Sequence, residues 1–199
     1  MCVREDYVRV STILNYFHEP ELVDWMIAKG KDAKKIGKKA MSIGTNVDEA
    51  IKEFVATGYY GRVKTIEATN CLDGFKRWYD DYKPTLTVGT RLYLDSLQLT
   101  GEPDIYWGQR VIDLKCAGAI RQKYWVQTGI YDFMGSRSLQ TAILRLHKHL
   151  ADYEYKEHNG EEVNLDADCF VNLLNVYNYL LLGEQQGGRD ANSITDNKE

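Results

Sequence analysis

The spacing of apolar residues changes twice along the chain, and each change marks a change of secondary structure. In the first part, apolar residues recur every three or four positions, which is the helical period. This spacing predicts helices at 11–17, from Pro20 onward, at 33–55 and at 69–81. After Pro84 the apolar residues alternate in twos, which is typical of strands that bury one face. The alternation predicts antiparallel strands at 86–94, 97–106 and 110–115.

The helical period then returns once before the chain alternates again. We expect a helix at 120–134, strands at 141–149 and 151–157, and a last helix at 166–182. This order indicates one α/β domain over 1–182, with a helical N-terminal part at about 1–82 and a sheet core at about 86–182. The polar, glycine-bearing segment 183–199 is predicted to be a disordered tail.

Charge argues against a generally basic surface but leaves room for a local one. The 199 residues carry a formal net charge of −4, so no overall positive field attracts nucleic acid. Residues 29–39 nevertheless hold six lysines and one aspartate. This run is either a solvated helix face or a surface that contacts phosphates through Lys34, Lys35 and Lys38.

Several other classes of site and location are disfavoured. The four cysteines, at positions 2, 71, 116 and 169, form no closely spaced pair, so we expect free thiols in a reducing cytoplasm. The N-terminus lacks an apolar signal segment, and no apolar run approaches the length of a membrane span. His147 and His149 lie two apart on a predicted strand, but no further zinc ligands stand at a suitable spacing.

The segment GEPDIYWGQRVIDLKCAG, residues 101–118, contains charged residues in an otherwise apolar hairpin. Gly108-Gln109 fits a two-residue turn of type II′, which places Asp104 opposite Asp113. Lys115 shares their face, because side chains alternate along a strand. Opposed carboxylates repel unless a positive group lies between them, and that group is either Lys115 or a divalent metal. The alternative is a polar, solvent-facing sheet in which Lys115 forms an ordinary ion pair.

This hairpin resembles the signature of the PD-(D/E)xK nucleases, with Pro103-Asp104 followed by Asp113-Leu114-Lys115. Gln127 and Tyr131 are similar to the QxxxY element of RecB-type exonucleases, and they follow the lysine strand as in that family. Upstream, the stretch from Gly44 to Asp48 resembles the family's glycine-led helix. The resemblance covers residues 44–131 and implies a restriction-endonuclease-like core, a mixed sheet of about five strands flanked by helices.

The resemblance also implies a metal site. Asp104, Asp113 and the carbonyl of Leu114 would bind Mg²⁺ or Mn²⁺, and Asp48 stands where the family usually has a histidine ligand. An aspartate there would favour hard cations. Without the resemblance, Asp48 is explained by an ion pair with Lys52, one helical turn away. An iron–sulfur cluster is not expected, because the cysteines are not grouped.

The remaining roles come from the same resemblance. Lys115 would orient or help to deprotonate the attacking water and would offset phosphate charge. Gln127 would contact the active site or the DNA backbone, supported by Tyr131. Taken alone, Gln127 and Tyr131 are an ordinary helix surface.

The leading hypothesis is therefore a metal-dependent DNA exonuclease of recombination, repair or replication. Its small size resembles phage-encoded members, which implies the cytoplasm of a bacterial or phage-infected cell. DNA ends would be its substrate, and a recombination or replication protein or further copies of the chain its partners. Two alternatives stay open: a non-catalytic relative that binds DNA or protein, and a structure-selective or RNA-cleaving endonuclease.

Overall fold

The computed structural model describes residues 7–17 and 19–193, and for 182–193 the backbone only. Helices dominate up to residue 82, as the sequence predicts. After the two-residue strand β1 (Val8–Arg9), these are α1 (Val10–Tyr16), α2 (Pro20–Lys29), α3 (Ala33–Thr57) and α4 (Ile66–Tyr82). Local chemistry explains the ends of α4, because the Thr65 side chain accepts a hydrogen bond from the Ala68 N–H and Lys83 takes the left-handed conformation after it.

A five-stranded mixed sheet forms the centre of the described chain, with the strand order β2-β5-β6-β7-β8. Its strands are β2 (Leu86–Val88), β5 (Ile105–Trp107), β6 (Arg110–Lys115), β7 (Gln140–Leu146) and β8 (Tyr153–Asn159). Within this sheet only the β6–β7 pair is parallel, and α5 (Gln122–Met134) makes the crossover between these two strands. The predicted fold class, a mixed sheet of about five strands flanked by helices, is confirmed.

The prediction of two unbroken strands at 86–94 and 97–106 is wrong. Each is interrupted, so that β3 (Leu92–Leu94) and β4 (Leu99–Gly101) leave the main sheet and join β1 in a second sheet of order β1-β4-β3. The interruptions face each other at Gly89 and Pro103. Pro103 has no N–H for a ladder, and a Cβ on Gly89 would lie only 1.9 Å from the Pro103 carbonyl oxygen. Only glycine permits the two segments to approach this closely.

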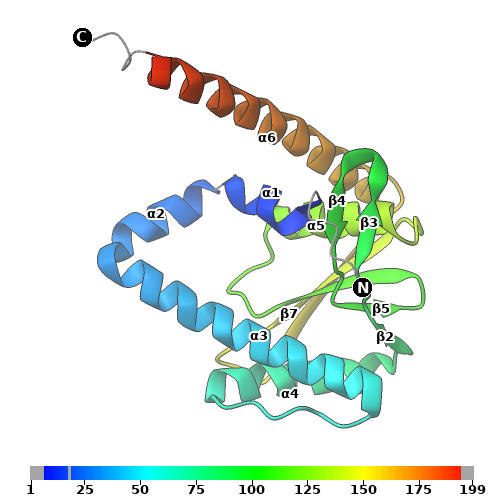
Figure 1. Ribbon diagram of the computed structural model, residues 1–199. Coiled ribbons are helices and arrows are strands. Elements are labelled where there is room, and N and C mark those ends of the chain that lie inside the picture. Colours follow the sequence, from blue (N-terminus) through cyan, green and yellow to red (C-terminus); the bar gives the residue numbers. More distant parts are fainter. Residues whose placement is uncertain (1–6, 18, 194–199) are drawn as a thin grey trace.

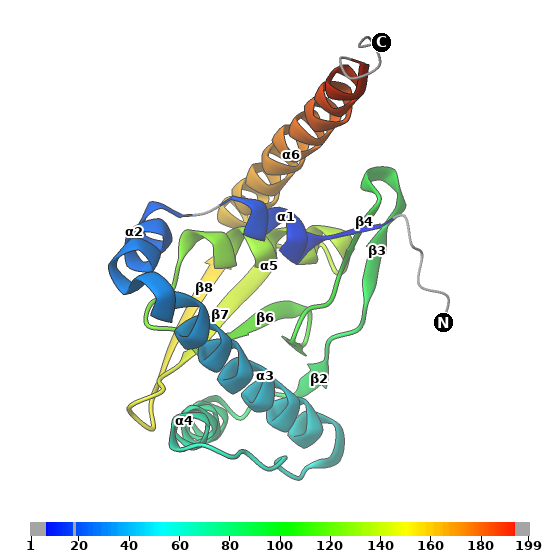
Figure 2. The same ribbon diagram turned by 60° about the vertical axis from the view of Figure 1, so that its left-hand side comes forward.

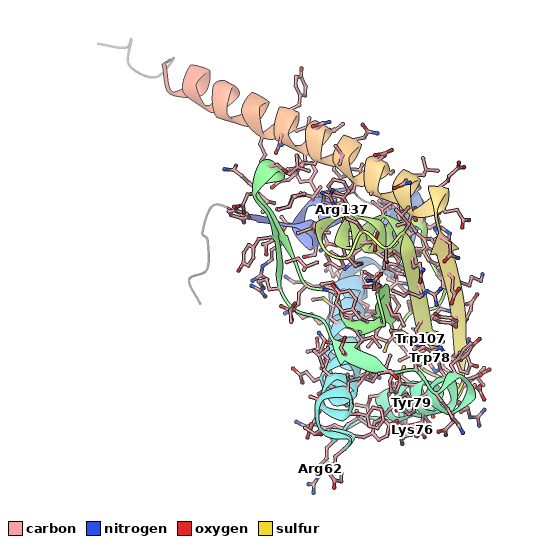
Figure 3. All side chains as sticks on the ribbon, turned by 90° about the vertical axis from the view of Figure 1, so that its right-hand side faces the viewer. Arg62, Lys76, Trp78, Tyr79, Trp107 and Arg137 are labelled. Atoms are coloured by element: carbon pink, nitrogen blue, oxygen red, sulfur yellow. The ribbon has the colours of Figure 1, made fainter. Side chains whose placement is uncertain are left out.

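Helices cover both faces of the main sheet, with α3 and α4 on one side and α5 and α1 on the other (Figure 1). The face toward α3 and α4 is apolar and rich in aromatic rings. Trp78 of α4 is fully buried and meets Trp107 of β5 edge-on, with the ring centroids 6.2 Å apart (Figure 3). Ile112 and Leu144 of the central strands belong to the same cluster.

The opposite face holds a second apolar cluster, in which Val111 of β6 meets Ile130 of α5 and Phe170 of α6 (Glu161–Ser193). Helix α6 then extends away from the body (Figure 2). It continues to Ser193, although the sequence predicts an irregular tail from 183; residues 194–199 of that tail lie outside the described residues. Within the described chain, every helix is too short or too polar to cross a membrane.

Candidate active site

The β5–β6 hairpin has the predicted register. Ile105 pairs with Ile112, Trp107 pairs with Arg110, and Gly108 has the positive φ of 60° that the turn requires. Asp104 immediately precedes β5 and lies beside the neighbouring strand. Its Oδ2 atom accepts a hydrogen bond from the Leu114 backbone N–H at 2.7 Å. The hairpin therefore holds Asp104 beside Asp113 and Lys115, as its sequence predicts.

Asp113 and Lys115 form a buried ion pair. The distance from Lys115 Nζ to Asp113 Oδ2 is 2.6 Å, and the side chain of Asp113 is only 2% exposed. Lys115 is 21% exposed and lies at the edge of the site. A solvent-facing sheet is thus not what the structure contains. Burying a carboxylate costs several kcal/mol of desolvation free energy, and the attraction to a well-placed partner offsets a similar amount.

Burial changes the protonation of both partners. Loss of water around Asp113 raises its pKa to about 7, and the charge of Asp104 adds to this, although Lys115 opposes it. For Lys115, burial alone would lower the pKa, but the charges of Asp113 and Asp104 outweigh it and raise the pKa. Lys115 is therefore an ammonium in this site.

Helix α5 contacts Lys115 through a short chain of hydrogen bonds. Lys115 Nζ donates to Gln127 Oε1 at 3.3 Å, and Gln127 Nε2 donates to the Tyr131 hydroxyl at 3.1 Å. Gln127 and Tyr131 are one turn apart on the helix and so lie on the same face. Lys115 also lies over the ring of Tyr124, 5.0 Å from its centroid. The sequence pair Gln127–Tyr131 is thus part of the site and not an ordinary helix surface.

Tyr131 depends on the second sheet for its place. It is 4% exposed, and burial raises the pKa of its hydroxyl to about 12. A Cβ on Gly101 of β4 would lie 2.4 Å from the ring atom Cε1 of Tyr131. Glycine at 101 therefore lets the ring pack directly against the strand backbone.

Asp48 and Lys52 reach the same site from α3. Lys52 Nζ lies 3.0 Å from Asp48 Oδ2 and 3.9 Å from Asp104 Oδ1. Burial raises the pKa of Asp48, as does the charge of Asp104, while Lys52 opposes the shift. The other carboxylate oxygen of Asp48, Oδ1, is buried and has no hydrogen-bond partner in the described chain. Asp48 is thus both paired with Lys52 and close to the hairpin.

The oxygen atoms of the site fit a hard divalent cation that is completed by water and substrate. No three His, Cys, Asp or Glu side chains of the described residues come close enough to hold a metal by themselves. Mg²⁺ does not require such a cage, since it often binds through one or two carboxylates, several waters and a substrate phosphate. Asp104 and Asp113 are suitable carboxylates, and Asp48 Oδ1 is an unsatisfied oxygen next to them. His147 and His149 lie in the loop after β7, not on a strand.

A cavity of about 250 Å³ adjoins Gln127 and Tyr131. Arg9 and Arg91 are among its lining residues, and Arg91 also binds Glu102, with 3.0 Å between Nη2 and Oε2. Sequence reasoning missed both arginines. They meet only through the second sheet, in which β1 and β3 flank β4, and the sequence carries no local signal for that pairing.

The lysine run lies away from this cluster. Lys34, Lys35 and Lys38 are exposed on the first half of α3, whereas Asp48 is on its second half. At 1.5 Å per residue, the helix separates Lys38 from Asp48 by about 15 Å and Lys34 from Asp48 by about 21 Å. The structure therefore does not bring the run into the active site. It leaves the run as a separate positive surface on the same helix.

Comparisons with known proteins give similarity at the level of structure. No model of a known protein family matches the sequence. No curated protein sequence matches it either. Among solved structures, an alkaline exonuclease from Laribacter hongkongensis aligns with a TM-score of 0.44 and 10% identity, covering 92% of this chain and 95% of that one.

Two further structures align similarly. A phage-related exonuclease from Haemophilus somnus has a TM-score of 0.44 and 17% identity, with 90% of this chain and 96% of that chain covered. The protein SSO0001 has a TM-score of 0.43 and 11% identity, with 88% and 79% covered.

Proposed function

We propose that this protein is a metal-dependent nuclease that hydrolyses phosphodiester bonds in DNA, and that it acts as an exonuclease of the PD-(D/E)xK superfamily. One observation carries the proposal. A buried Asp113–Lys115 pair and Asp104 meet where two antiparallel strands end their pairing. Burying these charges is costly, so a chemical role explains the arrangement better than stability does.

The metal would be Mg²⁺ or Mn²⁺. Asp104 and Asp113 would hold it, with the Leu114 carbonyl and Asp48 as further oxygen ligands. When bound, such an ion activates a water molecule and offsets charge on the phosphate. The hairpin register and the hydrogen bond from the Leu114 N–H hold these carboxylates in place, so they would fix where an ion binds.

Lys115 would orient the attacking water and neutralise phosphate charge. Its ammonium is fixed on three sides, by Asp113, by Gln127 and by the ring of Tyr124. Gln127 holds the ammonium at a set position, and Tyr131 in turn holds Gln127. A fixed ammonium offers its charge to the transition state without the cost of reorganisation.

DNA would approach through the basic groups around the site. The cavity beside Gln127 presents Arg9 and Arg91, whose guanidinium groups are suited to phosphate. Farther out, Lys34, Lys35 and Lys38 would contact the backbone of the same DNA. A substrate end held in this way supports an exonuclease that serves recombination, repair or replication, with a protein partner of those pathways or a second copy of this chain beside it.

The test is a cleavage assay on the full chain. Linear duplexes carrying a label at one 5′ or one 3′ end, and a closed circle as a control for endonuclease action, are incubated with Mg²⁺, Mn²⁺ or EDTA. Lys115→Ala and Asp113→Asn protein run beside the wild type. Metal-dependent release of label from one end, lost in both variants, is the expected result and gives the polarity.

The other outcomes are equally specific. Cutting of the closed circle would replace the exonuclease with an endonuclease on the same site. Retention of cleavage in both variants would refute the assignment of the site. DNA binding without cleavage under either metal would leave the non-catalytic binding protein as the better description.

A further inference from the structure

Lys52 is a second ammonium inside the site, and the proposed chemistry leaves it without a role. The side chain is 23% exposed, although an ordinary ion pair one turn apart on a helix faces solvent. It extends from α3 toward the hairpin and lies between Asp48 and Asp104, which belong to different elements. Its position therefore depends on the whole site and not on α3 alone.

Lys52 faces the carboxylate oxygen of Asp104 that does not accept the Leu114 N–H, which makes that oxygen the more available one for a metal. Asp104 Oδ2 is already used by the Leu114 N–H, whereas Oδ1 faces Lys52 Nζ at 3.9 Å. A divalent ion binds such an oxygen at about 2.1 Å. Any ion on Oδ1 would therefore lie within roughly 6 Å of the ammonium in its present position. At that separation, inside a half-buried site, the two positive charges repel strongly.

The formal charges of the site also indicate that Lys52 and a divalent ion would serve the same carboxylates. Asp48, Asp104 and Asp113 contribute −3 when ionised, and Lys52 and Lys115 contribute +2, which leaves −1. Lys115 is held by Asp113 and by α5, so it remains in place. Lys52 compensates the two carboxylates that Lys115 does not contact. Its positive charge thus offsets negative charge that a divalent ion would otherwise neutralise.

We propose that Lys52 is a built-in competitor of the divalent cation. Its ammonium holds Asp48 and Asp104 together when no ion is bound, and it must withdraw from Asp104 Oδ1 when an ion binds there. The residue thereby weakens metal binding in the absence of DNA. A phosphate of the substrate would offer the displaced ammonium a new partner. This inference rests on the proposed metal site, whose ligands it shares.

The experiment measures Mn²⁺ affinity directly, without DNA and without catalysis. Free Mn²⁺ is followed by its electron paramagnetic resonance signal as the full-length protein is titrated at pH 8. Lys52→Met keeps the length and apolar stem of the side chain and removes the charge. We expect it to bind Mn²⁺ at least tenfold more tightly than the wild type does. Lys52→Gln, a polar replacement, should show the same direction.

A matched control is available on α4. Lys76 pairs with Asp73 at 2.7 Å on the surface, so Lys76→Met removes a similar ion pair remote from the site. Its Mn²⁺ affinity should equal that of the wild type. Circular dichroism and thermal unfolding confirm that each variant is folded; if Lys52→Met is not, Lys52→Gln decides.

Failure of this inference and failure of the proposed function give different results. Equal or weaker Mn²⁺ binding by folded Lys52→Met and Lys52→Gln, with binding abolished in Asp113→Asn, would overturn the competitor role and leave the metal site intact. An absence of binding in the wild type and in both Lys52 variants would overturn the metal site itself, and the competitor role with it.

Discussion

Lys115 and the lysines at 34, 35 and 38 carry the same kind of charge in very different surroundings. Lys115 is enclosed by Asp113, Gln127 and the ring of Tyr124, and its contacts come from β6 and α5. The lysines at 34, 35 and 38 are exposed on α3 and surrounded by solvent. The fold thus places the single Lys115 in the site and leaves the denser run of lysines outside it.

The difference between the two groups is one of dielectric surroundings. An exposed ammonium is screened by water and salt, so its effect on a phosphate is weak and adds to that of its neighbours. An enclosed ammonium keeps most of its field and has a fixed position. The enclosed lysine should therefore control the rate of cleavage, and the exposed lysines should control only the strength of binding.

Among the lysine substitutions, removal of Lys115 should have the largest effect on cleavage. We expect Lys115→Ala to lower cleavage by about a thousandfold, a typical effect of losing a positioned catalytic group. It also leaves Asp113 buried without its partner, which should cost about 3 kcal/mol in the free energy of unfolding. Urea denaturation and the end-label assay measure the two effects separately.

The double variant Asp113→Leu/Lys115→Met serves as the control for stability. Replacing both charges with apolar groups of similar size should restore much of the lost stability, while cleavage stays absent. A Lys115→Ala protein that folds and cleaves at a near-normal rate would remove Lys115 from the mechanism.

The stability of the metal-free protein should reveal how far Asp113 is buried. Burial raises the pKa of Asp113 from 3.8 to about 7, so between these values the folded state holds a proton that the unfolded state has lost. Stability should therefore fall as pH rises from about 4 to about 7, by up to about 1.4 kcal/mol per pH unit from this group.

Asp113→Asn lacks the titrating group and should lack this contribution. The raised pKa values of Asp48 and Asp166 act in the same direction, but they are common to both proteins. The difference between the two pH profiles of unfolding free energy, measured in EDTA, isolates Asp113. Parallel profiles would mean that the carboxyl group is ionised throughout this range.

The hydrogen-bond chain on α5 should have a smaller effect on rate. Gln127→Ala releases Lys115 from one of its contacts, and we expect kcat to fall about tenfold with little change in KM. Tyr131→Phe removes only the bond to Gln127 and should cost a few-fold. Gln122→Ala, an exposed glutamine at the start of the same helix, is the matched control. An unchanged kcat in Gln127→Ala would show that Asp113 and the ring of Tyr124 position Lys115 without Gln127.

The exposed lysines should show the smallest effect on the chemical step. Replacing Lys34, Lys35 and Lys38 with glutamine should reduce the dependence of DNA affinity on salt by about two to three phosphate contacts. The cleavage rate at saturating DNA and low salt should change less than about twofold. A salt dependence equal to that of the wild type would make the run a solvated helix face.

Much of the site could be predicted from the sequence because its key relationships are local. The II′ turn at Gly108 sets which hairpin residues are opposite each other, and the alternation along β6 puts Asp113 and Lys115 on one face. The spacing of Gln127 and Tyr131 makes them neighbours on any helix. Each of these relationships is set by backbone geometry within a few residues of the chain.

The rest depended on contacts between distant segments. The sequence predicted unbroken strands at 86–94 and 97–106, but each is interrupted where Gly89 and Pro103 approach closely, and its two parts belong to different sheets. That division brings Arg9 and Arg91 together at the cavity.

Burial and the third carboxylate were likewise decided by the tertiary structure. Asp113 is an alternating residue in the sequence, and the packing of α5 and the neighbouring strands around β6 leaves it only 2% exposed. The sequence predicted the pair between Lys52 and Asp48, but the docking of α3 beside the hairpin added Asp104 to it. Local geometry determines which side chains share a face. The dielectric environment and the partners across elements depend on how the elements pack, and no short stretch of sequence contains that information.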